Sequence, residues 1–503
     1  MTKLTWWKRS VIVAGLAAFA VLASRPWQVR SAEPTQAGQV GQYKGSASCQ
    51  SCHDVSPAKP TAFPNAKDFI RLDEWTIWNA DDKHSIAFSN LKTERGQQMA
   101  TYLHVKDVTK PEVGCIGCHS ASASELKNRV EGTAYQPSEG VSCENCHGPF
   151  SGWLAPHLEP AFRTLSTAEW TKLGFIDLRS PQGKAEKCLS CHIGNVEEEK
   201  VVTHEMYAAG HPPLPSIEVA TFANSMPRHW WLHAERRDEK IKKELGFKEG
   251  QLEQTKLAIV GAAVALKTSL RLFADEASKS GAAGQPWPDY ARFDCWSCHH
   301  DLKRDGWRQA PGYKKGPPGR VPVSEWPLTL VKIGIERLVM DDRAAEALRT
   351  ELQGHERALR DQANIRPFGR KDSIAKAAEN YAIWTDVLIK KLGASKFDKA
   401  VAAKLLRKLV ETAEASTPDY DSARYVAWTI KLLVDDLGNS LPNRPQIQAV
   451  LAKFDAGLKL DLPSGRFYEI EKQMGDALKV IGDYDPATFK AQLGELLALL
   501  PQP

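Results

Sequence analysis

Regularly spaced apolar positions indicate that the last third of the chain is helical. Leu330, Ile333 and Leu338 open a series of apolar stripes at three- and four-residue steps, the spacing of helices with one buried face. The same pattern covers residues 381–392, 401–410, 425–437 and 493–500. Prolines that end helices stand between these stretches, at Pro367, Pro418, Pro442, Pro445, Pro463 and Pro486. We therefore expect residues 328–503 to form a Cys-free helical domain, arranged as a bundle.

A second stripe lies earlier, where Leu257, Val260, Gly261, Val264 and Leu270 recur at helical spacing. The apolar run 257–266 has only ten residues, which is too short to span a bilayer at about 20 residues, so it predicts a core helix. The glycine- and proline-rich stretch 281–288 should end this helix, and a similar composition over 309–327 predicts a linker. No alternating strand pattern of convincing length is present. The expected fold class is all-α with much irregular chain, with one module at 32–308 followed by the helical bundle.

The first 31 residues have the pattern of an export signal. Lys8 and Arg9 precede a 13-residue apolar run, Val11 to Ala23, and small residues follow it. Cleavage after Ser31 is expected, with an uncleaved N-terminal anchor as the alternative. We expect a periplasmic protein that associates with the membrane through this segment alone, if at all.

Composition and charge narrow the function classes. The chain is 42% hydrophobic and 25% charged, which is typical of a globular protein with a sizeable core. Its formal charge is +5, but residues 1–31 hold five basic residues and no acidic ones. Without them, basic and acidic residues balance at 61 each. No basic surplus remains, so nucleic-acid binding is not expected.

All ten cysteines fall in five copies of Cys-x-x-Cys-His, the attachment pattern of c-type haem. Two thiols at this spacing can add to the two vinyl groups of one porphyrin, and the histidine that follows can bind the iron. The motifs, numbered 1 to 5 in chain order, are Cys49, Cys52 and His53; Cys115, Cys118 and His119; Cys143, Cys146 and His147; Cys188, Cys191 and His192; and Cys295, Cys298 and His299. The sequence therefore predicts five covalently attached haem c groups, so residues 32–308 are expected to form a haem-cored multihaem cytochrome module.

Other uses of the cysteines explain the pattern less well. An exported protein favours disulfides, but a disulfide framework gives no reason for a histidine after every second cysteine. Structural zinc would pair two Cys-x-x-Cys knuckles or add separately spaced histidines. A thioredoxin-like redox site would need one motif, not five.

The chain resembles the cytochrome c-554 and hydroxylamine-oxidoreductase group of multihaem proteins. The resemblance rests on Gly140 to Pro149 around motif 3, and on motif 1 followed by the segment Trp78 to His84 with Ser85 and Ala87. It covers residues 45 to about 300. The tetrahaem cytochrome c-554 type has four motifs, whereas this chain has a fifth after a gap of 107 residues.

Nine histidines remain after the five in the motifs, enough to close every iron with a second histidine. The resemblance places a distal ligand at His84. His157 follows motif 3 by ten residues, and His204 and His211 are spaced to serve two neighbouring irons. His229, beside two tryptophans, is the fifth candidate. His104, His233, His300 and His355 carry no comparable local signal, and methionine ligation by Met206 or Met226 is the alternative.

Two functions fit these residues. In the first, the chain is a periplasmic pentahaem cytochrome that carries electrons between redox partner proteins through closely spaced, mostly bis-histidine haems. In the second, one iron is open and acts on a small nitrogen compound such as nitrite or hydroxylamine, as the resembling enzymes do. The first is favoured, because the nitrite-reductase type holds its active haem with lysine and every motif here ends in histidine. The helical region 328–503 is the candidate surface for a homo-oligomer.

Overall fold

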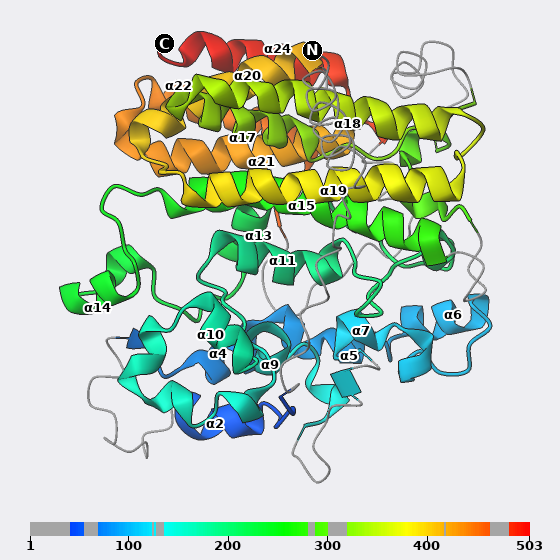
Figure 1. The fold of residues 1–503 in the computed structure, drawn as a ribbon, viewed down its shortest axis with the longest axis vertical. Helices are drawn as coiled ribbons and strands as arrows, with labels where there is room; N and C mark the ends of the chain where they lie inside the picture. Colours follow the sequence, from blue (N-terminus) through cyan, green and yellow to red (C-terminus); the bar gives the residue numbers. More distant parts are fainter. Residues whose placement is uncertain are drawn as a thin grey trace, which may run out of the picture. The chain divides into compact units, whose positions relative to one another are not determined.

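The computed structural model describes residues 41–54, 69–122, 125–126, 135–279, 287–299, 319–416, 419–462 and 482–502. The predicted export signal 1–31, His300 and most of the predicted linker 309–327 lie outside these ranges. The described residues hold helices and connecting chain, with two isolated β-bridges and no sheet (Figure 1). The prediction of an all-α fold with much irregular chain is confirmed.

Short helices dominate the first half of the chain. They are α2 (Ala47–His53), α4 (Glu74–Asp81), α5 (Ala87–Asn90), α6 (Glu94–Tyr102), α7 (Ile116–His119), α9 (Cys143–His147), α10 (Thr167–Lys172), α11 (Pro181–His192), α12 (His204–Ala208), α13 (Val219–Ser225) and α14 (Glu239–Glu244). Motifs 1 to 4 lie on α2, α7, α9 and α11, and motif 5 lies on the 3-10 helix η9 (Cys295–Ser297). One helical turn separates the two cysteines of each motif, so both thiols project to the same side.

The longest helix, α15 (Glu253–Lys279), contains the apolar run predicted to be core, and that prediction is confirmed. By length and composition it could cross a membrane, but 78% of its most apolar window is buried inside the fold. Residues Ala258 to Ala265 are fully buried, which requires neighbours on every side of the helix. Gly261 meets the side chain of Val219 on α13, and Ile259 lies against Gly334 beyond the predicted linker. The helix α15 therefore joins two parts of the chain.

Long helices follow after residue 327, where the apolar stripes predict them. They are α17 (Leu328–Asp341), α18 (Ala347–Asn364), α19 (Lys371–Ala394), α20 (Lys399–Ser416), α21 (Tyr420–Leu437), α22 (Arg444–Leu458) and α24 (Pro486–Leu499). Side-chain caps begin several of them, such as Asp419 before α21 and Asp485 before Pro486 of α24. Figure 1 shows α15 running alongside α19, with α11 and α13 on its other side.

One hydrophobic cluster extends from the motif-bearing half into the C-terminal helices. It includes Leu189, which lies inside motif 4 on α11, together with residues of α13, α15, α17, α19 and α21. From the predicted linker, Val321, Val323 and Trp326 pack against the same cluster. Polar contacts reinforce this packing, because Thr255 of α15 donates to Asp436 of α21 at 2.6 Å and Lys267 pairs with Asp386 of α19 at 2.7 Å. The helix that carries motif 4 thus shares a core with the C-terminal helices.

Candidate functional site

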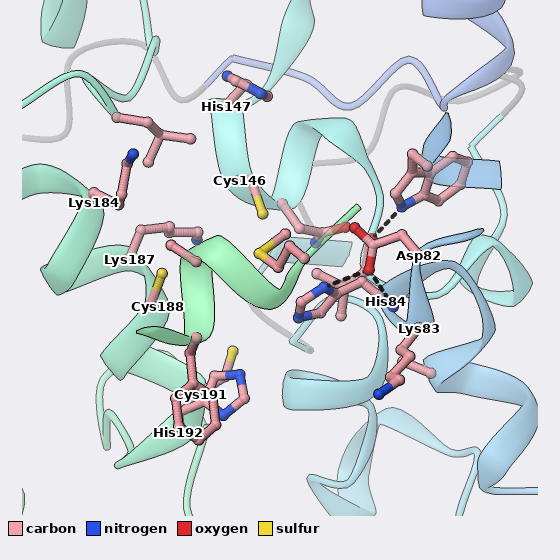
Figure 2. A pocket seen from close by; sticks show the side chains of 18 of the residues that line it. Asp82, Lys83, His84, Cys146, His147, Lys184, Lys187, Cys188, Cys191 and His192 are labelled. Carbon is pink, nitrogen blue, oxygen red and sulfur yellow. Dashed lines mark hydrogen bonds and ion pairs between the residues drawn. The ribbon is translucent and has the colours of Figure 1, made fainter. Parts of the chain in front are cut away.

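Of the twelve cysteines and histidines in motifs 1 to 4, all but the exposed Cys52 line one cavity of about 1660 Å³. A single small-molecule site usually occupies roughly 300–1,000 Å³, so this cavity has room for more than one cofactor. Figure 2 shows part of it, where Cys146, Cys188 and Cys191 lie around the same space with Lys184 and Lys187 beside it. None of the ten cysteines, all of which the structure describes, is in a disulfide.

Three motif histidines each face a histidine from another part of the chain. The ring centroids of His192 and His84 are 6.4 Å apart, and those of His119 and His211 are 6.5 Å apart. Two imidazoles on opposite sides of one iron should have centroids roughly 6 Å apart, since each nitrogen lies about 2 Å from a bound metal and the ring centre about 1 Å farther. Both pairs therefore have the separation that a shared haem iron requires.

Motif 5 has the same arrangement outside the large cavity. The rings of His299 and His204 have centroids 6.3 Å apart and are inclined by 31°. Cys295 and Cys298 are exposed, and His204 also contacts the ring of Tyr290 at 5.5 Å. This pair meets the same distance requirement as the pairs at motifs 2 and 4.

The two remaining motif histidines have His229 and His157 as neighbours. Burial and, to a smaller extent, the nearby His229 lower the pKa of His147 to about 4. Burial also lowers the pKa of His157, and the charge of the nearby His53 adds to this lowering. His157 packs among Phe150, Trp153 and Phe162, which fixes the direction of its ring. The structure thus brings three of the five predicted distal histidines against a motif histidine, and it places His229 and His157 close enough to His147 and His53 for their charges to interact.

The hydrogen bonds of these histidines leave one ring nitrogen available. Nδ1 of His84 lies 2.9 Å from the Asp82 carboxylate, and Nδ1 of His53 lies 2.9 Å from Glu74. In four others Nδ1 donates to a backbone carbonyl: His119 to Ala87, His157 to Leu154, His211 to Pro212 and His229 to Pro227. A partner at Nδ1 holds the tautomer in which Nε2 carries the lone pair that a metal needs.

Electrostatics also favour the neutral, metal-binding form of most of these rings. Burial lowers the pKa of His192 and of His211 to about 4. His84 differs, because burial lowers its pKa but the hydrogen bond and charge of Asp82 outweigh that effect and raise it overall. A neutral imidazole is the form that coordinates iron, so the buried rings are suited to do so.

The histidines without a local sequence signal lie elsewhere or make other contacts. His104 is exposed and has a left-handed backbone, with φ 55°. His233 lines the cavity, but its Nε2 faces Glu253 at 3.5 Å. His355 stacks on Tyr381 in the C-terminal helices, with ring centroids 5.3 Å apart, and so is partly buried rather than a free surface residue.

Carboxylates that support the site were missed by the sequence analysis. Glu144, inside motif 3, is buried and accepts hydrogen bonds from the backbone of Lys44, Gly45 and Phe150 at 2.7–3.0 Å. It ties the start of α2 to α9 and so places motif 1 beside motif 3. For Asp82, two residues before His84, the short spacing is a usable signal. For Glu74, 21 residues after His53, and for Glu144 no sequence signal exists, because their partners are distant in the chain.

The cysteines also show which motifs are neighbours. Sγ of Cys118 lies 4.0 Å from the carbonyl oxygen of Cys191, which brings motif 2 to motif 4. Burial raises the pKa of Cys146 to about 12, with Cys188 and Cys191 contributing, so motif 3 also adjoins motif 4. A hydrogen bond with Cys49 raises the pKa of Cys143, so motif 1 adjoins motif 3. The motifs of the large cavity therefore follow the spatial order 1, 3, 4, 2.

Comparison with known proteins agrees with the chemistry of these residues. Residues 48–148 match the family described as cytochrome c554 and c-prime, a stretch that covers motifs 1 to 3. No curated protein and no solved structure matches the chain. The similarity supports a c-type cytochrome that binds haem covalently and takes part in electron transfer.

Proposed function

We propose that this chain is a periplasmic pentahaem c-type cytochrome that carries electrons between redox partner proteins, with each iron closed by two histidines. The observation that carries the proposal is that three motif histidines each face a second histidine, with His229 and His157 near the other two. The residues fit the cofactor in three respects: two thiols per motif, facing imidazoles at 6.3–6.5 Å in three pairs, and Nδ1 partners that leave Nε2 available.

The proposed ligand pairs combine residues far apart in the chain. We assign them as His53 with His157, His119 with His211, His147 with His229, His192 with His84, and His299 with His204. Haem iron held in this way accepts and releases single electrons without binding substrate. The protein supplies the ligands, their orientation and the distances between the motifs.

The groups that accept a hydrogen bond from Nδ1 of the ligand histidines would set how strongly the iron at each motif favours its oxidised state. The carboxylate of Asp82 accepts from Nδ1 of His84 and increases the electron density on that ring, as Glu74 does for His53. A more basic imidazole stabilises ferric iron more than ferrous iron. Where Nδ1 donates instead to a neutral carbonyl, as in His211, the effect is weaker. The chain can therefore give its five irons different reduction potentials.

The order of the motifs supports a conduit. In space, motif 1 lies beside motif 3, motif 3 beside motif 4, and motif 4 beside motif 2, in each case through their cysteines. Cofactors at these positions would therefore be consecutive neighbours. The alternative function needs an open iron that acts on nitrite or hydroxylamine, and motif 2 is the first place to look for one, because no histidine near it in the sequence carries a ligand signal. His211 facing His119 at 6.5 Å supports the closed, electron-carrying site instead.

The location and assembly of the protein are part of the same proposal. Export by residues 1–31 would place the chain where thioether bonds to haem are formed, and the resembling cytochromes are typically periplasmic. The partners we propose are soluble or membrane-bound redox proteins, with no role for nucleic acid. The helices after residue 327 are the proposed surface for a second copy or for docking.

The haem number can be measured directly. The full chain, exported in a bacterial host that assembles c-type cytochromes, should have a denatured mass equal to the mature polypeptide plus five haems, because each motif offers two thiols. The double variant Cys295→Ser/Cys298→Ser should lose one haem and keep four. A wild-type mass with fewer than five haems, or free thiols in any motif, would contradict the proposal.

A further inference from the structure

One short segment, residues 202–211, carries a histidine toward each of two motifs. His211 faces His119 of motif 2, and His204 faces His299 of motif 5. The helix α12 begins at His204, where the Thr203 side chain accepts the N–H of Met206, and it is continuous to Ala208. Seven positions of chain separate the two histidines and could span at most about 25 Å if fully extended, and α12 shortens that distance because a helix rises only about 1.5 Å per residue. The two motifs are therefore held close together by one piece of chain.

Motif 5 is fixed to this segment by polar contacts. The backbone N–H of His204 donates to the Asp289 carboxylate at 3.0 Å, and the Arg292 guanidinium donates to the carbonyl of Val202. Arg292 also forms an ion pair with Glu276 of α15 at 2.7 Å, in which both side chains are at most 10% exposed. The chain leading into motif 5 is thus anchored both to the residues beside His204 and to the core helix α15.

An aromatic side chain lies in the same place. The ring of Tyr207 is 6.0 Å from the ring of His211. Tyr207 therefore packs beside the proposed distal ligand of motif 2, on the same short helix that begins at His204.

We infer that the fifth haem adjoins the four-haem group at motif 2 and is held there by residues 202–211. The spatial order of the motifs is then 1, 3, 4, 2, 5. This inference rests on the proposed function. It gives motif 5, which like motif 4 lies beyond the region similar to cytochrome c554, a definite role: motif 5 is one end of the row and motif 1 is the other. Electrons entering at motif 5 would pass first to motif 2 and from there to motifs 4, 3 and 1.

Electron paramagnetic resonance of the oxidised full-length protein tests this order. His204→Ala should turn the motif 5 iron high-spin, and the larger moment should speed relaxation of its nearest low-spin neighbour. The low-spin signal of the motif 2 iron is identified as the one that disappears in His211→Ala. In His204→Ala this signal should saturate only at a higher microwave power than in the wild type. His157→Ala, which opens the iron at the opposite end of the row, is the matched control and should leave the saturation of that signal unchanged.

The outcomes separate this inference from the proposed function. If His204→Ala produces a high-spin iron but changes instead the signal that is lost in His84→Ala or His229→Ala, or changes none, motif 5 does not adjoin motif 2 and the inference is wrong. If His204→Ala produces no high-spin iron, the ligand assignment at motif 5 is wrong, and the proposed closed site fails there.

Discussion

A chain that ends at Trp326 should fail to fold stably and should accumulate without its full set of haems. Ending the chain there removes α17 to α24, which cover one side of α15. The other side of α15 packs on α11, where Leu189 of motif 4 belongs to the same hydrophobic cluster. Loss of the C-terminal helices would therefore expose the core that positions Cys188 and Cys191.

The size of the effect follows from what α15 buries. Leu257, Ile259, Val260, Val264 and Leu266 are each at most 5% exposed in the full chain. Burying one such side chain contributes about 1.5–3 kcal/mol. Exposing three or four of these side chains would cost as much free energy as the whole net stability of a typical domain, about 5–15 kcal/mol. The truncated chain should therefore be degraded or insoluble rather than merely weakened.

Yield of haem-loaded protein and its thermal unfolding measure this prediction. The control is the full chain with Ile383→Ser and Val387→Ser, which changes two α19 residues that are 42% and 48% exposed. This control should match the wild type in haem content and in unfolding temperature. A truncated chain that carries five haems with an unchanged oxidised spectrum would show that residues 328–503 are an independent domain, as the sequence predicts.

Replacement of a single distal histidine should convert one haem from low spin to high spin. In His211→Ala the iron at motif 2 would lose the imidazole that faces His119 at 6.5 Å, and an alanine side chain cannot bind iron. The same result is expected at motif 4 for His84→Ala, at motif 5 for His204→Ala, at motif 1 for His157→Ala and at motif 3 for His229→Ala. The visible absorption spectrum of the oxidised protein should then gain a high-spin band from one of its five irons.

Two further variants serve as controls. His355→Ala lies in the C-terminal helices, and His104→Ala changes an exposed residue, so neither should alter the oxidised spectrum. A wild-type spectrum in any of the five distal variants would contradict the ligand pair assigned to that residue. A high-spin band in His104→Ala would mean that a ligand has been misassigned.

Local patterns in the sequence predict the helices well, because each stripe reports one buried face. The stripe beginning at Leu257 becomes α15, and the stretch 425–437 lies in α21. The patterns do not tell what covers a stripe. The contact between α15 and the C-terminal helices depends on close approaches such as Ile259 to Gly334, which join residues 75 positions apart. A division between two domains and a shared core therefore look the same in the sequence.

The site shows the same limit. The motif cysteines and histidines are evident from their spacing, and the five distal candidates can be chosen from their local context. Their partners cannot, because His84 reaches a motif 108 residues later and His204 reaches one 95 residues later. Motif 2 illustrates the consequence: the nearest histidine before it in the sequence, His104, is exposed, whereas the fold brings His211 to it. Long-range packing decides which irons are closed.

The central claim, five haems each closed by two histidines, is tested most directly by electron paramagnetic resonance of the purified, fully oxidised wild-type protein. The account predicts low-spin signals that integrate to five irons per chain, with no high-spin signal. A high-spin ferric signal of one iron per chain would contradict it, since one haem would then have an open position and the alternative function, reaction with a small nitrogen compound, would become the better explanation.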